Sequence, residues 1–238
     1  MGSQTSPNQW RIDPVGDRCL LVGLGTTVDP ETSARVHALV ERLRERPIEG
    51  VRDIAPAFTT VALHYQPECL GPRPFARLKE LLLERLAAPI EIGRAEARVI
   101  EVPVCYGGEF GPDIDEVATK CGLSLEQVIA LHLGSPHRVY MLGFAPGFPF
   151  IGGLDAALAM PRRVTPRTQI PSGTVAIARD QTCIYPLQTP GGWNLIGRTP
   201  LRLFDPTVEP PCLLRPGDTI RFVRIASDTY QAMIESRP

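Results

Sequence analysis

Proline is the feature of this sequence that most restricts how the chain can fold. The chain has 25 prolines, and thirteen of them lie between Pro136 and Pro216. Because proline lacks a backbone N–H and clashes with the preceding helical turn, this stretch cannot be helical. It is also too rich in Val, Ile, Leu and Phe to remain disordered. Short strands joined by fixed turns are therefore predicted from residue 138 onward.

The C-terminal half is predicted to form a closed or nearly closed β-barrel. Two short helices, 113–120 and 125–133, come first, and Ser124 with Gln127 three residues later has the pattern of a capping box. Several short strands separated by Gly and Pro are typical of barrels. The clearest strand patterns occur at 174–178, 182–185, 201–204 and 219–223.

The N-terminal part alternates between helix and strand patterns. Helices are predicted from Asp29-Pro30, an N-cap residue followed by proline in the first turn, and from Pro74. Helices over a small, largely antiparallel sheet give an α+β layer pair. We therefore predict an α+β fold with two domains, residues 1–94 and 95–238. The N-terminal strands are expected at 19–22, 50–54 and 60–65, and a further strand at 98–104.

Composition limits the partners and the compartment. A formal net charge of -1 and a pI of about 6.4 argue against nucleic-acid binding, which needs a basic surface. No signal peptide and no apolar run of about 18 residues is visible, so we expect a cytoplasmic protein without membrane association. Six cysteines without a Cys-x-x-Cys pattern are expected to be free thiols.

Motifs for catalysis, metals and cofactors are missing from the sequence. Without a Gly-x-x-x-x-Gly-Lys-Ser/Thr motif, the chain by itself is not expected to bind ATP through a P-loop. No Gly-x-Ser-x-Gly motif marks a nucleophile. His132 and His137 are five residues apart with Pro136 between them, so they are not expected to form a metal pair. We therefore assign no metal site and no catalytic residue.

The segment 139–154 combines aromatic residues with glycines. Its aromatic residues include Tyr140, Phe144 and Phe148. Since glycine allows close approach of the backbone, this pattern can line a concave surface with ring faces and backbone amides. We interpret these three residues as candidate ligand-binding residues.

Two arginines, Arg163 and Arg167, lie on a proline-rich loop shortly afterwards. They are a candidate clamp for a carboxylate or phosphate, because guanidinium groups bind such anions in pairs of hydrogen bonds. The alternative is that they pair with acidic residues of the chain itself at the surface. The acids considered for this pairing are Asp155, Asp180 and Glu109.

The glycine-rich segment 189–200 contains Trp193 and Arg198. A tryptophan in such a turn either fills a core or offers a flat platform to a ligand. The surrounding glycines favour the platform, and we include both residues among the candidates.

Several of these segments resemble a known family. Residues 140–154, 161–167, 171–178, 181–186 and 190–200 resemble the family of the B-type subunit of 5-oxoprolinase, also called allophanate hydrolase subunit 1 and the kinase A inhibitor family. They are also similar to the smaller half of the carboxyltransferase domain of urea carboxylase. The blocks Gly-Phe-x-Pro-Gly-Phe-Pro and Pro-Gly-Gly-Trp, the latter followed by Ile-Gly-Arg-Thr-Pro, are highly specific.

The resemblance implies a cyclophilin-like β-barrel in residues 95–238 and adds Ser172 and Gln181 to the candidate substrate-binding residues. The chain departs from the family pattern at Ser172 and Thr174, in a turn that commonly reads Pro-Ala-Gly-Ser. Two usual glycines of the family are replaced by Arg179 and Cys183.

The resemblance also implies an activity and partners. The chain would act with a larger carboxyltransferase-like subunit and a third oxoprolinase subunit, and would be inactive alone. The assembly would open 5-oxo-L-proline to L-glutamate with ATP hydrolysis, so ATP is expected at the level of the complex. One alternative is a regulatory inhibitor of a sensor histidine kinase. Another is the smaller subunit of an allophanate hydrolase or urea carboxylase type of carboxyltransferase.

Overall fold

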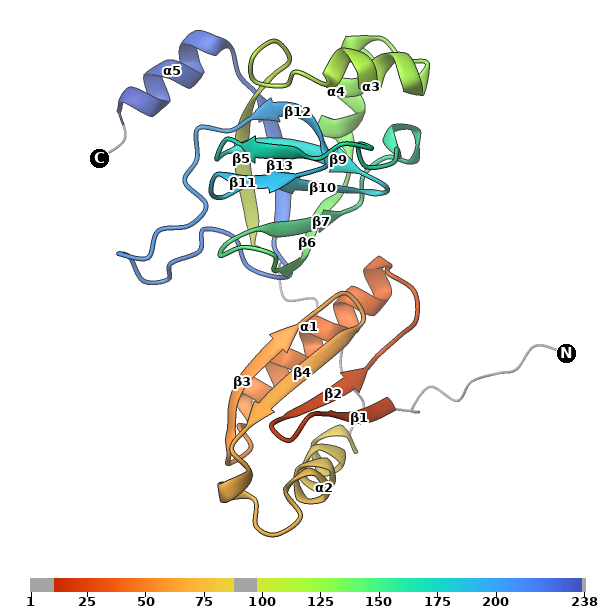
Figure 1. Ribbon diagram of the computed structural model, residues 1–238, viewed down its shortest axis with the longest axis vertical. Helices are drawn as coiled ribbons and strands as arrows, with labels where there is room; N and C mark the ends of the chain where they lie inside the picture. The colour runs from red at the N-terminus through yellow and green to blue at the C-terminus, as the bar shows by residue number, and fades with distance from the viewer. Residues whose placement is uncertain (1–10, 88–97, 237–238) are drawn as a thin grey trace, which may run out of the picture. The chain divides into compact units, whose positions relative to one another are not determined.

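The computed structural model describes residues 11–87 and 98–236. The chain divides into two compact units, residues 1–95 and 96–238 (Figure 1). The domain boundary predicted between residues 94 and 95 falls outside the described residues. The predicted α+β class is confirmed, because the first unit combines helices with an antiparallel sheet and the second contains a closed barrel.

The first unit is a four-stranded antiparallel sheet with two helices. The strand order is β1-β2-β4-β3, so β1 and β3 form the two edges. Leu39, Leu78 and Leu63 belong to one core that joins both helices to the sheet. The strands are β1 (Arg11–Val15), β2 (Cys19–Gly23), β3 (Val51–Pro56) and β4 (Thr60–Tyr65), and the helices are α1 (Pro30–Glu45) and α2 (Pro74–Leu86).

Helix α1 begins and packs as its sequence predicts. The side chain of Asp29 accepts a hydrogen bond from the backbone N–H of Thr32, and Pro30 lies in the first turn. An N-cap of this kind is worth about 1 kcal/mol. The apolar stripe of the helix is buried against the sheet and consists of Val36, Leu39, Val40 and Leu43.

The second unit is built on a closed barrel of seven strands in the order β10-β7-β6-β13-β5-β12-β9 (Figure 1). Neighbouring strands run antiparallel except for β13 and β5, which are parallel. A separate two-stranded sheet pairs β8 (Arg167–Ile170) with β11 (Thr189–Gly191). The barrel strands are β5 (Val99–Tyr106), β6 (His137–Leu142), β7 (Pro149–Gly152), β9 (Thr174–Ala178), β10 (Gln181–Ile184), β12 (Asn194–Arg198) and β13 (Thr219–Arg224).

The predicted helices of this unit form as α3 (Ile114–Cys121) and α4 (Leu125–Gly134), and the Ser124–Gln127 capping box is present. A third helix, α5 (Ser227–Glu235), was not predicted. None of the helices in the described part of the chain is long and apolar enough to cross a membrane.

The strand predicted at 201–204 is wrong. In this segment the structure has a single β-bridge, between Phe204 and Cys212. Prolines stand at both sides of the segment, at Pro200 and Pro206, and proline cannot donate to a strand ladder. Leu203 nevertheless packs into the barrel core.

The barrel has apolar residues on both sides of its wall. Successive residues of a strand point to opposite faces. Val175 and Ile177 of β9 belong to the core cluster inside the barrel, while Ala176 and Ala178 belong to a different cluster. All five residues of β9 are buried, so the outside of the barrel is covered at this strand.

Candidate functional site

The cluster on the outside of the barrel wall, here called the outer-face cluster, is where several predicted site residues meet. Its members come from the β6–β7 turn, from β8, β9, β10 and β12, from the residue after β10 and from the loop before β12. Phe148 and Trp193, both predicted from the sequence, are buried in it at 2% and 6% exposure. The cluster consists of Phe148, Ile170, Ala176, Ala178, Cys183, Tyr185, Trp193 and Leu195.

Aromatic rings make most of the contacts in this cluster. Phe148 packs edge-to-face against Tyr185, with ring centroids 5.2 Å apart, and its centroid lies 6.5 Å from that of Trp193. Phe150 adds a tilted contact to Trp193 at 6.3 Å. Such edge-on arrangements are favoured by ring quadrupoles and fix the orientation of each ring.

Phe144 extends the cluster to the surface. Its ring lies 5.2 Å from that of Phe148, yet its side chain is 66% exposed. Its backbone φ is 68°, a left-handed conformation that is uncommon for a bulky residue. The turn that holds it is closed by a hydrogen bond from the Gly143 N–H to the Phe148 carbonyl. An exposed aromatic ring on a strained turn is a feature of binding surfaces.

Arg162 covers the other side of the cluster. Its guanidinium carbon lies 5.6 Å from the centroid of the Trp193 ring, a cation–π contact. No carboxylate of the described residues lies within ion-pair distance of Arg162. Trp193 therefore fills the cluster and packs against the guanidinium of Arg162. Because its side chain is buried, it does not present an open ring face to a ligand.

Arg163 and Arg167 come together as predicted, but on a carboxylate of the chain itself. Arg167 donates to Asp113 through both terminal nitrogens, at 2.8 and 2.7 Å, and Arg163 donates to Asp113 at 3.0 Å. Arg163 also donates to Glu116 at 2.9 Å. The acid partners considered from the sequence, Asp155, Asp180 and Glu109, are therefore the wrong ones.

Asp113 holds these contacts from a buried position. It precedes the first residue of α3, but its side chain makes no capping bond to that helix. Its carboxylate, 4% exposed, accepts instead from the two arginines and from the backbone N–H of Leu195 at 2.8 Å. With its charge paired and its oxygens hydrogen-bonded, this carboxylate satisfies the conditions for a stable buried ion pair. The arrangement ties α3, β12 and the loop before β8 together.

The phenol of Tyr185 lies in the field of this charged loop. Burial raises the pKa of Tyr185, Cys183 raises it further, and Arg162 and Arg167 oppose the increase. The phenol is therefore neutral across the physiological range and can act only as a hydrogen-bonding group.

Ser172 and Arg198 lie at the same end of the β9–β12 strand pair, where Arg198 is opposite Thr174. Ser172 is exposed in the turn before β9, and a side chain placed on the adjacent Gly173 would collide with the Thr199 carbonyl. Arg198 ends β12, with its guanidinium carbon 6.0 Å from the ring centroid of Phe110. Arg198 and Asn194 are the two ends of β12, so about 13 Å of extended chain separates them.

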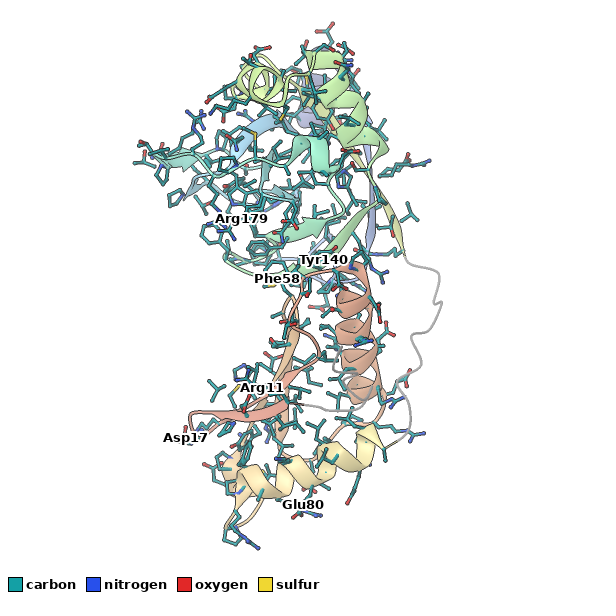
Figure 2. All side chains as sticks on the ribbon, turned by 90° about the vertical axis from the view of Figure 1, so that its right-hand side faces the viewer. Arg11, Asp17, Phe58, Glu80, Tyr140 and Arg179 are labelled. Carbon is teal, nitrogen blue, oxygen red and sulfur yellow. The ribbon has the colours of Figure 1, made fainter. Side chains whose placement is uncertain are left out.

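Tyr140 and Gln181 are not members of the outer-face cluster, although Gln181 lies directly opposite one member, Ala178, on the neighbouring strand. Tyr140 is buried against Gly152, where a larger residue would collide with its ring. Gln181 is half-buried at the start of β10, opposite Ala178. Arg179 lies two residues before Gln181, in the turn between β9 and β10. It is at the barrel surface and has a backbone φ of 55° (Figure 2). Glycine adopts this conformation more readily than arginine.

His132 and His137, which were not expected to form a metal pair, have neighbouring rings. Their ring centroids lie 4.8 Å apart inside the second unit. His132 lies within 2.8 Å of the Tyr106 hydroxyl and 3.1 Å of the Thr182 hydroxyl, which donates to the Ala176 carbonyl. His132 therefore donates to Thr182 and accepts from Tyr106. Burial lowers the pKa of both histidines, that of His137 to about 4. These contacts make the pair a structural network.

Sequence reasoning missed Asp113, Arg162 and Tyr185. Asp113 was assigned as the start of a helix, which is correct, and nothing local shows that its side chain turns to arginines fifty residues away. The sequence of 162–167 gives no sign of which of its three arginines lacks an acid partner.

Fold and site together define a protein of two α+β units whose distinctive surface is the outer wall of a closed barrel. A family model described as "Carboxyltransferase domain, subdomain C and D" matches residues 10–214, most of the chain. The chain therefore belongs to the carboxyltransferase-domain family, subdomains C and D.

Within this family, the chain is similar along most of its length to subunits of 5-oxoprolinase. The B-type subunit of 5-oxoprolinase from Bacillus subtilis (strain 168) is 44% identical over 235 residues, which cover 95% of this chain and 98% of the relative. The corresponding 5-oxoprolinase subunit of Escherichia coli O157:H7 is 42% identical over 88% of this chain and 93% of the relative. The family resemblance seen in the sequence is thus confirmed.

Solved structures agree with this placement. A crystal structure of TTHA0988 matches with a TM-score of 0.77 at 43% identity, covering 88% of this chain but 40% of that chain. The chain thus spans about two fifths of that protein. PH0987 from Pyrococcus horikoshii matches with a TM-score of 0.56 at 38% identity over 92% of this chain and 100% of that chain. The Kluyveromyces lactis urea amidolyase, at 20% identity and a TM-score of 0.75, shows a shared fold.

Proposed function

We propose that this chain is the B-type subunit of an ATP-dependent 5-oxoprolinase, which opens 5-oxo-L-proline to L-glutamate. Support comes from relatives that are named as this subunit of 5-oxoprolinase and match nearly end to end at 44% and 42% identity. At such identity over such coverage, the site residues and the surfaces that meet partners are expected to be shared.

The observation that carries the proposal is the position of Arg162. Its guanidinium rests on Trp193 at the surface of the outer-face cluster, while the neighbouring Arg163 and Arg167 are occupied by Asp113. Arg162 is thus the arginine of this loop that can bind an added anion. The carboxylate of 5-oxoproline, or of a phosphorylated intermediate, would pair with Arg162 through charge-assisted hydrogen bonds.

An anion would bind strongly to Arg162 only if the site were shielded from water. An arginine–carboxylate pair open to water is worth about 1 kcal/mol or less, and exclusion of water strengthens it considerably. Apolar side chains stand exposed on three connections of this unit, with Phe144 at 66%, Val164 at 101% and Leu187 at 37% exposure. We infer that a larger carboxyltransferase-like subunit packs on these side chains and closes the site, with a third subunit completing the enzyme.

The ATP requirement is assigned to the complex. The sequence has no P-loop, and the arginines best placed to bind phosphate, Arg163 and Arg167, already pair with Asp113. This chain would contribute substrate binding and orientation, and the nucleotide would be held by a partner. It follows that the isolated chain is inactive.

Reconstitution tests the proposal. The chain is co-expressed with a larger carboxyltransferase-like subunit and a third oxoprolinase subunit, and glutamate formation from 5-oxo-L-proline is measured with and without ATP. Glutamate is expected only from the complete, ATP-supplied complex, and the chain alone serves as the control. A stable complex of all three subunits that does not turn over 5-oxoproline would overturn the proposal.

A further inference from the structure

We infer that the first unit contains a second ligand site, for a small carboxylic acid with a compact apolar body. A pocket of about 290 Å³ lies between the C-terminal end of α1, the connection that follows it, and strands β3 and β4. This volume is at the lower end of the range for small-molecule sites. The inference concerns a different unit from the barrel and does not depend on the oxoprolinase proposal.

The base of the pocket is apolar and preformed. Leu43 of α1, Ile48 of the connection and Leu63 of β4 line it, with exposures of 1%, 5% and 0%. All three also belong to the core of the unit, so the base is held rigid by packing on its far side. A rigid apolar base binds an aliphatic or aromatic group and repels groups whose hydrogen bonds would go unmade.

The rim of the pocket carries arginines without acid partners. Arg44 projects from the last turn of α1, and Arg52 lies at the bulge of β3. Arg52 donates to the neutral side-chain oxygen of Gln66. Within 11–87 and 98–236 neither guanidinium has a carboxylate at ion-pair distance, whereas Arg35 on the same helix pairs with Glu31 at 2.6 Å.

One acid also lines the pocket, so the charge of the rim has to be weighed. Asp53 accepts a hydrogen bond from the backbone N–H of Ile54, which holds one of its oxygens. Two guanidinium groups against one carboxylate leave the rim with a formal charge of +1. An anion is therefore favoured over a cation at the mouth, above an apolar base.

The strand beside the pocket argues for a compact ligand and against an added peptide strand. β3 is an edge of the sheet (Figure 1), but its register shifts between Val51 and Asp53, and it ends at Pro56. A bulge and a proline both interrupt the row of backbone groups that an incoming strand would need. The carboxylate thus belongs either to a free small acid or to the last residue of another chain.

Titration of the full chain with two acids of the proposed kind tests this site. The probes are 4-methylpentanoate and phenylacetate, each compared with its neutral amide, and binding is followed by two-dimensional amide NMR. We expect saturable shifts around the pocket and binding of each acid at least tenfold tighter than that of its amide. A peptide ending in a free leucine carboxylate identifies a chain terminus as the source if it binds tighter than the free acids. Weaker binding of the peptide identifies a free acid.

Matched variants assign the binding to the rim. Arg44→Met and Arg52→Met keep the aliphatic stems but remove the charges, and each should weaken acid binding at least fivefold while leaving amide binding unchanged. Arg35→Met, on the same helix but paired with Glu31, should have no effect. The inference is wrong if the acids do not saturate, if acid and amide bind equally, or if Arg35→Met weakens binding as much as Arg44→Met.

Discussion

Asp113 and Arg167 form a two-pronged ion pair in which both terminal guanidinium nitrogens donate to one buried carboxylate. The pair joins the start of α3 to the loop that carries Arg162 and Arg163. The loop is thereby fixed against the barrel, and the next arginine along it is presented outward. The charged pair is thus part of the scaffold that positions the candidate site.

Removal of Asp113 should destabilise the barrel unit. In Asp113→Ala, Arg163 and Arg167 lose their buried partner, and we expect the free energy of unfolding to fall by about 3 kcal/mol. Urea denaturation followed by tryptophan fluorescence measures this. Glu116→Gln serves as the control, because the Glu116 side chain is 44% exposed and the loss of its charge should cost less than about 1 kcal/mol. An Asp113→Ala variant as stable as Glu116→Gln would show that the pair contributes little.

Removal of the Arg162 charge should impair the reconstituted enzyme without unfolding the chain. Arg162→Met is expected to lower kcat/KM for 5-oxoproline about 10- to 100-fold, chiefly through KM, since a hydrogen bond to a charged group is worth about 1.5–3 kcal/mol. Arg162→Lys should restore part of the loss. Arg202→Met, which removes an exposed arginine paired with Asp205, is the matched control. Equal activity of the two methionine variants would exclude Arg162 from the site.

Phe144 should matter for assembly more than for stability. Phe144→Gly removes a left-handed phenylalanine and an exposed ring, so the isolated chain should be as stable or up to about 1 kcal/mol more stable. Affinity for the larger subunit should fall at least tenfold if the ring is an interface anchor. Calorimetric titration of the two subunits measures this. Val223→Ala, which truncates an exposed apolar side chain of β13, should leave affinity unchanged.

The hairpin residue Arg179 offers a test of backbone strain. Because its φ is 55°, Arg179→Gly should be neutral to about 1 kcal/mol stabilising, as glycine adopts this conformation without a steric penalty. Asp180→Gly in the same turn lacks that gain and should destabilise by about 0.5–1 kcal/mol. Thermal unfolding of the two variants compares them directly. The reverse order would mean that the Arg179 side chain makes a stabilising contact.

The buried histidines should make the barrel unit sensitive to acid. Burial lowers the pKa of His137 to about 4 from an ordinary value of 6.5, so the unfolded chain binds more protons than the folded chain between these values. Stability should therefore be complete above about pH 6.5 and fall as the pH drops toward 4, by up to about 3 kcal/mol from this residue.

A neutral substitute checks the origin of this slope. His137→Gln keeps a donor for the His132 carbonyl, which now accepts from the ring of His137 at 2.7 Å, but cannot titrate. Urea denaturation at pH 4.5, 5.5 and 7.5 should show a shallower pH dependence than in the unaltered chain. A slope equal to that of the unaltered chain would assign the acid sensitivity to other groups.

Much of the fold could be predicted from the sequence because its signals are local. The stripe on α1, the Ser124 capping box and the proline-punctuated strands depend only on neighbouring residues. Helix α5 was missed because its weak apolar pattern follows a long stretch of strand and turn signals. The 201–204 segment shows the opposite error, since its alternation is strand-like but no strand is available to pair with it.

The candidate site was less predictable because its partners are distant in the chain. Phe148 and Trp193 were identified from their glycine-rich surroundings and do meet in one cluster. The partner of Arg163 and Arg167 could not be deduced, since fifty or more residues separate them from Asp113. The contact between the rings of His132 and His137 could not be deduced from their five-residue spacing either. The chain turns at Pro136 and brings the second ring back against the first.

Side chains of β9 alternate between the inside and the outside of the barrel, and this alternation makes the strand intolerant of inserted or deleted residues. Two bulky aliphatic side chains of the strand point inward and two alanines point toward Phe148 and Trp193. Adding or deleting one codon within the strand would exchange these sets, leaving voids inside and collisions outside. Point substitutions there can be repaired by neighbours, but frame-preserving insertions cannot. Epitope tags or fused domains therefore belong in the exposed connection after Asp205 and not near this strand.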